Sequence, residues 1–479
     1  MKMKNEDDFE YRKLANTFVG LIQDGTLVPG TRVPSLRQTS LQKRVSVTTA
    51  LKAYRLLEDR GYLRASPKSG YFVSNPAATL LDATTTPGPP RHERSVSLPK
   101  IMNTLLEHSS DPKFVPLGCN SPRSRLLAPE NLDRSLARST RRYGADKNAH
   151  ASPKGDVRLR QQVARRSLTW GGAFSYEDIM ITCGCTEAVI IALQAVTKPG
   201  DMVAVESPTY FGNLHTMEAL KLRAYELPTD AETGIDLEAL EKALQQQVIN
   251  ACLLPPSFSN PLGFTMSEEK KLAILKLLKK HGIPLIEDDA AGEIYFGKER
   301  PRPFSALDPS ADVLYCSSFS KTLAPGYRVG WIATKQHMDG VLDKKLTTTL
   351  YSPSLSQFAL AEFLSSGGYD NHLRKLRRNL EEALDMLGHA VSAAFPKGTH
   401  VSRPGGGNAL WLELPGTIDS LELFYQALDE GICIVPGEIF SVDDRYSNCL
   451  RLSAAHGWDA RIEAGVATIG ALAKRMMQD

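Results

Sequence analysis

Short apolar runs alternate with helical patterns along most of the chain, from residue 101 onward. Strands that alternate in this way with helices form βαβ units, whose strands pair in parallel. We therefore predict an α/β fold in which helices cover a mostly parallel sheet. The expected strands are residues 179–181, 202–205, 251–254, 284–287, 313–316 and 329–333.

The chain has 479 residues, enough for two or three domains of roughly 100–200 residues each. Residues 76–99 are rich in proline and contain ATTTPGPPRHERS, the composition of a linker. We predict a first domain over residues 1–75, a linker over 76–100 and a second domain over 101–479. In the second domain we expect a large part at about 150–350 and a small part formed by 351–479 together with 101–149.

Composition argues against several classes of protein. No apolar run approaches the roughly 20 residues of a membrane-spanning helix, and the charged N-terminus has no apolar stretch after it. We expect a cytoplasmic protein without membrane attachment. Seven cysteines without a CxxC pair argue against a disulfide framework, and Cys183 with Cys185 is too sparse a cluster for zinc. We expect no metal site.

Three helices and a hairpin are predicted in the first 75 residues. The first helix covers residues 11–24, where apolar residues recur at helical spacing. Ser35 is placed to cap a second helix that runs to about residue 43, and Ser46 to cap a third that ends at Gly61. Two short segments, residues 62–65 and 71–74, bracket a turn at 67–70. This order predicts a winged helix-turn-helix module.

The charge of this module suits a nucleic-acid partner. Residues 31–70 hold nine basic and two acidic side chains, an excess that suits phosphate contacts or an ordinary charged surface. The segments YRKLA, LVPGTRVPSLR, SVTTALKAYRLLEDRGYL and SGYFV resemble the GntR-type winged helix-turn-helix. The resemblance implies that the third helix enters the major groove and that the wing tip reaches toward the minor groove. The implied DNA contacts are Arg37, Ser46, Thr48, Thr49, Lys52, Lys68 and Gly70.

One position departs from the GntR pattern. Val47 stands where relatives often carry an arginine, and it offers only apolar contact, for instance with a thymine methyl group. The hydroxyl residues beside it are equally suited to capping the helix, which leaves two interpretations for each of them.

The segment SFSKTLAPGYRVGW, residues 318–331, sets one lysine among hydroxyl residues, with Arg328 seven positions beyond Lys321. It follows an expected strand, so Lys321 should leave the carboxyl end of the sheet, where ligands bind in open α/β folds. Desolvation there would lower the pKa of Lys321 and make it nucleophilic toward an aldehyde. The alternative is a solvated loop lysine beside serines.

This segment resembles the fold-type I, aspartate-aminotransferase-like enzymes that use pyridoxal 5′-phosphate (PLP). The resemblance implies that Lys321 forms a Schiff base with PLP, with Ser318, Ser320 and Arg328 around the phosphate. A second phosphate element is expected between the first strand of the sheet and the next helix, where the helix dipole favours an anion. Its residues are Gly184, Cys185 and Thr186.

The same resemblance assigns the rest of the site. Tyr210 would stack on the pyridine ring, and Asn260 would donate to the O3′ oxygen. Asp288 would pair with the pyridine nitrogen, although the sequence alone does not distinguish it from its neighbours Glu287 and Asp289. A substrate or effector α-carboxylate would be bound by Arg451, whose guanidinium suits a bidentate pair, and by the backbone amide of Gly118.

Two tyrosines that relatives commonly carry are absent. Ala290 and Ala291 stand where a tyrosine two or three residues after the aspartate shares the O3′ bond, and His150 stands where a tyrosine reaches the partner subunit's phosphate. PLP binding should survive both changes. Efficient turnover is less expected, which favours a sensor over a catalyst.

Winged helix, Pro-rich linker and aminotransferase-like domain in this order resemble the MocR subfamily of GntR regulators. The resemblance implies a head-to-tail homodimer that binds operator DNA and responds to an amine, an amino acid or PLP itself. Two other interpretations stay open. One is an active aminotransferase with an accessory DNA-binding domain, and the other is a cofactor-free dimerisation scaffold.

Overall fold

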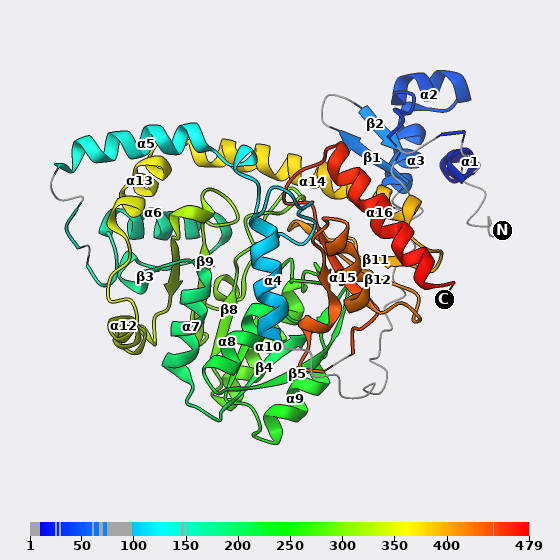
Figure 1. Cartoon of the computed structure of the whole chain (residues 1–479). Helices are drawn as coiled ribbons and strands as arrows, with labels where there is room; N and C mark the ends of the chain where they lie inside the picture. Colours follow the sequence, from blue (N-terminus) through cyan, green and yellow to red (C-terminus); the bar gives the residue numbers. More distant parts are fainter. Residues whose placement is uncertain are drawn as a thin grey trace, which may run out of the picture. The chain divides into compact units, whose positions relative to one another are not determined.

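A computed structural model describes residues 10–23, 26–27, 30–59, 62–66, 70–73, 98–144, 148–150, 152–443 and 445–478. The chain divides into two compact units, Met1–Thr79 and Leu80–Asp479, which are coloured from blue to red along the sequence in Figure 1. Most of the predicted linker, residues 76–97, lies outside the described residues, and residues 98–100 begin the helix α4 (Leu98–Ser110).

The first unit is the predicted winged helix-turn-helix. Its elements are α1 (Glu10–Gln23), α2 (Leu36–Lys43), α3 (Val47–Asp59), β1 (Leu63–Ser66) and β2 (Gly70–Val73). The two strands pair antiparallel. Ser35 caps α2 and exchanges hydrogen bonds with Gln38 in a capping box. Tyr54 is buried in the core, where its hydroxyl lies 2.7 Å from the hydroxyl of Thr39.

The second unit contains a sheet of eight strands in the order β3-β10-β9-β8-β7-β4-β5-β6. The strands are β3 (Ile179–Thr182), β4 (Met202–Ser207), β5 (Arg223–Asp230), β6 (Gly234–Ile235), β7 (Ala251–Leu254), β8 (Leu285–Asp288), β9 (Val313–Ser318) and β10 (Gly330–Ala333). The inner strands from β9 to β5 pair in parallel, whereas β10 runs antiparallel to both of its neighbours. The mostly parallel sheet and all six predicted strands are confirmed. The sequence prediction missed β5 and β6.

Helices cover both faces of this sheet (Figure 1). On β9, Leu314 and Cys316 join one apolar cluster, whereas Tyr315 belongs to the cluster on the opposite face. One face packs against α7 (Cys185–Val196), α8 (Phe211–Ala219) and α12 (Met338–Thr347). The other packs against α6 (Val157–Ser167), α9 (Leu237–Gln245), α10 (Glu268–His281) and α11 (Phe304–Leu307). Because both faces are buried, the central strands are almost continuously apolar, which explains why they were predictable.

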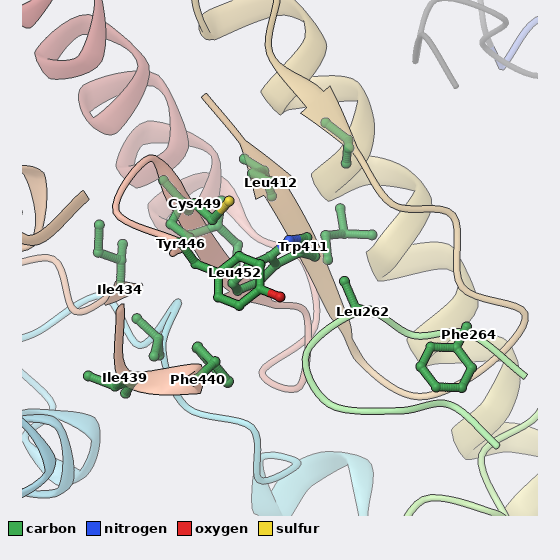
Figure 2. Packing of buried hydrophobic residues seen from close by; sticks show 14 of the residues in the cluster. Leu262, Phe264, Trp411, Leu412, Ile434, Ile439, Phe440, Tyr446, Cys449 and Leu452 are labelled. Carbon is green, nitrogen blue, oxygen red and sulfur yellow. The ribbon is translucent and has the colours of Figure 1, made fainter. Parts of the chain in front are cut away.

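A smaller antiparallel sheet lies in the C-terminal part, in the order β11-β12-β14-β13. Its strands are β11 (His400–Val401), β12 (Ala409–Glu413), β13 (Val435–Pro436) and β14 (Cys449–Ser453), and it packs with α15 (Ser420–Asp429) and α16 (Ala460–Met476). Figure 2 shows the core beside it, where the ring centroids of Trp411 and Phe440 are 5.4 Å apart, and those of Trp411 and Tyr446 are 5.9 Å apart.

Three further helices complete the unit: α5 (Pro129–Arg142), α13 (Ser354–Ser365) and α14 (Gly368–Ala394). Ile101 and Leu105 of α4 belong to the same cluster as the small sheet, whereas α5 packs on α13, which also contacts α6. Among the described residues, the helices are all too short or too polar to cross a bilayer.

Candidate functional site

Lys321 lies in the turn that follows β9, at the carboxyl end of the strand. Its side chain is half-buried, and Nζ donates a hydrogen bond to the carbonyl of Asn120. Burial, together with the nearby charge of Arg451, lowers the pKa of Lys321 from 10.5 to about 8. At pH 7 this shift increases the neutral fraction of the amine about 300-fold. The amine therefore has the reactivity that capture of an aldehyde requires.

Asp288 is the last residue of β8, which pairs in parallel with β9, so that it lies at the same edge of the sheet as Lys321. Its Oδ1 accepts hydrogen bonds from the thiol of Cys185, at 3.3 Å, and from the N–H of Ala290, at 3.3 Å. The side chain of Asn213 also hydrogen-bonds to this carboxylate. Burial raises the pKa of Asp288, and these hydrogen bonds and the charge of Lys321 partly oppose the rise.

The two neighbouring carboxylates have partners elsewhere. Glu287 accepts hydrogen bonds from the backbone N–H groups of Phe304 and Ser305. Asp289 pairs with Arg300 and accepts a hydrogen bond from a tyrosine hydroxyl of β9. The structure thus distinguishes the three acidic residues in a way that the sequence did not.

The N-terminus of α7 is shaped to receive an anion. The backbone N–H groups of Cys185 and Thr186 lie in the first turn of this 12-residue helix, where they have no intrahelical acceptor. Gly184 precedes them with a φ of +87°, and a Cβ there would lie 2.4 Å from Nη2 of Arg328. Only glycine therefore allows the arginine to approach the helix end so closely.

Arg328 brings a positive charge to this helix end. Its Nη2 donates to the carbonyl of Cys183 at 3.0 Å, and its Nη1 lies 3.4 Å from the hydroxyl of Ser320. The hydroxyl of Ser318 is buried and accepts the N–H of Ser320 at 3.3 Å. Arginine, hydroxyl groups and free amides at a helix N-terminus form a donor set that fits a phosphate.

A buried ion pair supports the loop that precedes α7. Lys345 of α12 is completely buried, and its Nζ lies 2.9 Å from Oε2 of Glu187 and 2.9 Å from the hydroxyl of Ser352. Glu187 also accepts the backbone N–H of Cys183 and the hydroxyl of Thr349. Burial alone would raise the pKa of Glu187, but these hydrogen bonds and the charge of Lys345 lower it overall.

Arg451 of β14 is a buried cation beside the lysine. It is 2% exposed, donates through Nη1 to Oδ1 of Asn260 at 3.0 Å, and donates through Nη2 to the carbonyl of Gly118 at 2.7 Å. Within the described part of the chain, Nε has no hydrogen-bond partner and no carboxylate forms an ion pair with the guanidinium. Burial lowers the pKa of Arg451 to about 10. Gly118 thus faces Arg451 with its carbonyl, and the predicted use of its amide stays a prediction.

Tyr210 is the residue before α8. Burial raises the pKa of its hydroxyl, and Arg451 and Asp288 are near enough to act on it electrostatically. A Cβ on Gly212 would lie 2.5 Å from the ring of Tyr210, so this glycine makes room for the ring. The structure therefore brings together Lys321, Asp288, Arg451, Asn260 and Tyr210.

The two departures from the aminotransferase pattern are visible in the structure. Ala290 contributes its N–H to Asp288, and its side chain has no group that could bind an O3′ oxygen. His150 is exposed and stacks on Tyr351, with ring centroids 4.5 Å apart.

In the first unit, Arg37, Thr48 and Lys52 are exposed, as a DNA-contacting surface requires. The hydroxyl of Ser46 accepts the N–H of Thr49 at 2.9 Å, so Ser46 caps α3, and it lies 2.8 Å from the hydroxyl of Thr49. Their contacts with DNA stay a prediction. Val47, the departure from the GntR pattern, is 48% exposed at the start of α3.

The structure describes part of the wing. Gly70 begins β2 with a φ of +101°, beside the guanidinium of Arg32. Lys68 lies outside the described residues.

Sequence reasoning missed several residues of the site. Asn213 carried one signal, because it lies in the first turn of the helix that follows Tyr210. Cys185 was predicted for its backbone alone, not for its thiol. Lys345 and Glu187 are 158 residues apart, and no sequence pattern connects them.

The chain combines a winged helix-turn-helix with an α/β unit that holds Lys321, Asp288 and a set of donors fitted to a phosphate, which is the arrangement of a PLP-binding regulator, and the comparisons with known proteins agree. Residues 117–469 match the family described as aminotransferase class I and II, and residues 11–73 match the bacterial regulatory proteins of the gntR family. The chain is 40% identical over 463 residues to the HTH-type transcriptional regulator YdcR of Escherichia coli, covering 97% of this chain and 98% of that one.

Enzymes are also similar to the second unit. The 2-aminoadipate transaminase of Thermus thermophilus is 30% identical over 377 residues, which are 78% of this chain and 93% of that one. The solved structure of LysN, an α-aminoadipate aminotransferase from the same species, has a TM-score of 0.73 at 29% identity and covers 79% of this chain and 95% of that one.

This chain therefore belongs to the aminotransferase class I and II family, in the MocR-like form that carries a gntR-type DNA-binding domain. It is a transcriptional regulator of that architecture, and its cofactor is PLP, which excludes the cofactor-free scaffold.

Proposed function

We propose that the protein regulates transcription by sensing a small molecule that carries both an amine and a carboxylate, at a PLP site centred on Lys321. The observation that carries this proposal is Arg451. Among the described residues this buried guanidinium has no acidic partner, which is costly, because its charge has been removed from water and is compensated only by two hydrogen bonds to neutral groups. A carboxylate that enters from outside would supply the missing partner.

Each part of the cofactor has residues that fit it. The anion cup of Gly184, Cys185, Thr186, Ser318, Ser320 and Arg328 would hold the phosphate. Asp288 would face the pyridine nitrogen, Tyr210 the ring and Asn260 the O3′ oxygen. When bound, PLP supplies an aldehyde that captures amines and a ring that withdraws electrons.

The chain's own residues have separate tasks in this proposal. Lys321 attaches the cofactor through its amine, which burial makes partly neutral at physiological pH. An effector amine would displace it, and the released amine would stay beside the carbonyl of Asn120. Arg451, supported by Asn260, would orient the effector by its carboxylate.

A signal requires that the effector binds two states of the protein unequally. Arg451 belongs to the small C-terminal sheet, whereas Lys321 follows a strand of the large one. An effector that contacts both would favour the arrangement in which these sheets are close together. We propose that this closure changes the operator affinity of a head-to-tail homodimer. Binding of DNA would use Arg37, Ser46, Thr48, Thr49, Lys52, Lys68 and Gly70, and would place the protein in the cytoplasm.

The test combines absorbance with operator binding. Purified protein should absorb visible light, and a panel of amino acids and of amines that lack a carboxylate should be titrated into it. Arg451→Gln should lose the response to amino acids by about tenfold or more in affinity, because a charged hydrogen-bond partner is removed, and should keep the response to simple amines. Equal weakening for both ligand classes would contradict the assignment of Arg451.

A second candidate function is an active aminotransferase. It is favoured by the presence of Lys321, Asp288 and Arg451 together, because this set serves proton transfer at a captured amine. Ala290 and Ala291 in place of a tyrosine favour the sensor. Conversion of a donor amino acid and an acceptor keto acid into the corresponding keto acid and amino acid over many turnovers, with pyridoxamine phosphate formed once per site when the acceptor is left out, would establish the enzyme instead.

A further inference from the structure

The turn that carries Lys321 is held by the long helix α14. The hydroxyl of Tyr369 donates to the hydroxyl oxygen of Thr322 at 2.8 Å, and Nε2 of His372 donates to the carbonyl of Thr322 at 2.6 Å. Thr322 is 2% exposed, Tyr369 4% and His372 8%. Two buried hydrogen bonds from consecutive turns of one helix thus hold both the backbone and the side chain of the residue that follows the lysine.

The turn is also held on the other side of the lysine. The N–H of Phe319 donates to the carbonyl of Val329 at 3.0 Å, and the carbonyl of Phe319 accepts the N–H groups of Thr322 and Leu323. Lys321 therefore lies between Phe319 and Thr322, which are both fixed by hydrogen bonds, and α14 provides the bonds to Thr322. A displacement of α14 relative to the large sheet must either break these hydrogen bonds or move the lysine's backbone.

The protonation of Tyr369 and His372 suits both of them as hydrogen-bond donors. Burial raises the pKa of Tyr369 to about 12, so the hydroxyl keeps its proton. Burial also lowers the pKa of His372, which keeps the ring neutral, with a proton on the nitrogen that faces the carbonyl. The ring of Tyr369 is held independently by the guanidinium of Arg166, 4.4 Å from its centroid, and by the edge of Phe319.

The same helix reaches the small sheet. Tyr369 and Leu373, near its start, belong to the apolar cluster of the large sheet, whereas Leu387 and Val391, near its end, belong to the cluster that contains β12 and β14. The helix has 27 residues, which corresponds to a rod of roughly 40 Å. Arg451 lies on β14. One continuous element therefore connects the core beneath Arg451 with the turn of Lys321.

We propose that Tyr369 and His372 are positioning residues, which hold the amine of Lys321 through Thr322 and couple it to the small C-terminal sheet by way of α14. This inference rests on the proposed function, in that PLP is attached at Lys321. The two residues do not touch the cofactor. They determine where the lysine's backbone lies, and a closure of the small sheet would shift that position through the helix.

The experiment uses the full-length protein loaded with PLP and four variants. Tyr369→Phe and Thr322→Val each remove the hydroxyl bond, from its two sides. His372→Leu removes the donor to the carbonyl, and His372→Gln restores one, because the amide nitrogen of glutamine can occupy the place of Nε2. The readouts are the visible circular dichroism of the bound cofactor, which reports its orientation, and the rate of PLP release.

We expect Tyr369→Phe, Thr322→Val and His372→Leu to change the circular dichroism and to release PLP about three- to tenfold faster, the equivalent of one buried hydrogen bond. The double variant Tyr369→Phe/Thr322→Val should release PLP no faster than either single variant, since all three lack the same bond. His372→Gln should resemble the unmodified protein. The matched control is Tyr54→Phe, which removes the same kind of tyrosine–threonine bond from the first unit and should change neither readout.

The outcomes distinguish a failure of this inference from a failure of the proposed function on which it rests. If folded Tyr369→Phe and His372→Leu keep the circular dichroism and the release rate of the unmodified protein, the positioning role is wrong while PLP binding stands. If borohydride reduction of the unmodified protein fixes no pyridoxyl group on Lys321, the proposed function fails first. If Tyr369→Phe does not fold, Thr322→Val tests the same bond from its other side.

Discussion

Replacement of Lys345 by methionine tests whether a buried ion pair supports the phosphate-binding loop. The change leaves the largely buried carboxylate of Glu187 without the Nζ that lies 2.9 Å away, but keeps the N–H of Cys183 and the hydroxyl of Thr349 as donors. Loss of one partner of a buried pair costs about 3–5 kcal/mol, and the remaining donors place this case near 3 kcal/mol. The free energy of unfolding of the second unit should fall by about that amount.

The cofactor provides the sharper measurement. Glu187 accepts a hydrogen bond from the backbone N–H of Cys183, and the carbonyl of Cys183 accepts one from Arg328. Loss of the Lys345–Glu187 ion pair should therefore disturb Arg328 and weaken the binding of the phosphate specifically. We expect Lys345→Met to lower the affinity for PLP about tenfold, the equivalent of one charge-assisted hydrogen bond, and to leave the affinity for pyridoxal, which lacks the phosphate, unchanged.

Lys344→Met is the matched control, because this neighbour in the same helix pairs with Asp343 on the surface and its loss should cost less than about 1 kcal/mol. The double variant Lys345→Met/Glu187→Gln removes both charges and should recover part of the lost stability. Equal losses of affinity for PLP and pyridoxal would refute the reasoning, as would an unfolding free energy within about 1 kcal/mol of the unmodified protein.

Three further predictions concern separate parts of the chain. Gly184→Ala should abolish detectable PLP binding in an absorbance titration, because its Cβ would displace Arg328 and strain a positive φ; binding at unchanged affinity would contradict the anion cup. Glu293 pairs with Arg166, Arg300 and Arg377. Burial alone would raise the pKa of Glu293, but these three charges lower it from 4.5 to about 2, so its contribution to stability is present above pH 4.5 and is lost as the pH falls toward 2. That contribution is about 3 kcal/mol, and Glu293→Gln should flatten the fall of unfolding free energy over this range. Tyr54→Phe should destabilise the first unit by about 2 kcal/mol in thermal unfolding, because the hydroxyl of Thr39 and the carbonyl of Pro34 each lose a hydrogen bond, and should leave the transition of the second unit in place.

The sequence predicted those parts of the fold whose physical causes are local. The central strands are buried on both faces and are apolar over their whole length, so they were evident. The strand β5 was missed because its sequence, RAYELPTD, shows neither a continuous apolar run nor a regular alternation, and contains Pro228 near its end. The helix caps at Ser35 and Ser46 follow from one side chain and the next turn, and both appear in the structure.

A short motif around Lys321 was enough to propose a site at that lysine, whereas only the family resemblance singled out Asp288 from Glu287 and Asp289. It was not predictable where side chains meet from distant segments. Lys345 finds Glu187 158 residues away, and His372 finds Thr322 50 residues away, in both cases because the fold buries them together. Within the described residues, the lack of an acidic partner for Arg451 is likewise a property of the folded core, since sequence alone does not say which carboxylates come near it.

The most direct measurement compares the unmodified protein with Lys321→Ala after borohydride reduction, followed by peptide mass analysis and by titration of operator DNA with and without amino acids. The unmodified protein should carry a pyridoxyl group on the peptide that contains Lys321, and its operator affinity should change with a carboxylate-bearing amine. In Lys321→Ala both the adduct and the response should disappear while the protein stays folded. An unaltered response in that variant would contradict the central claim.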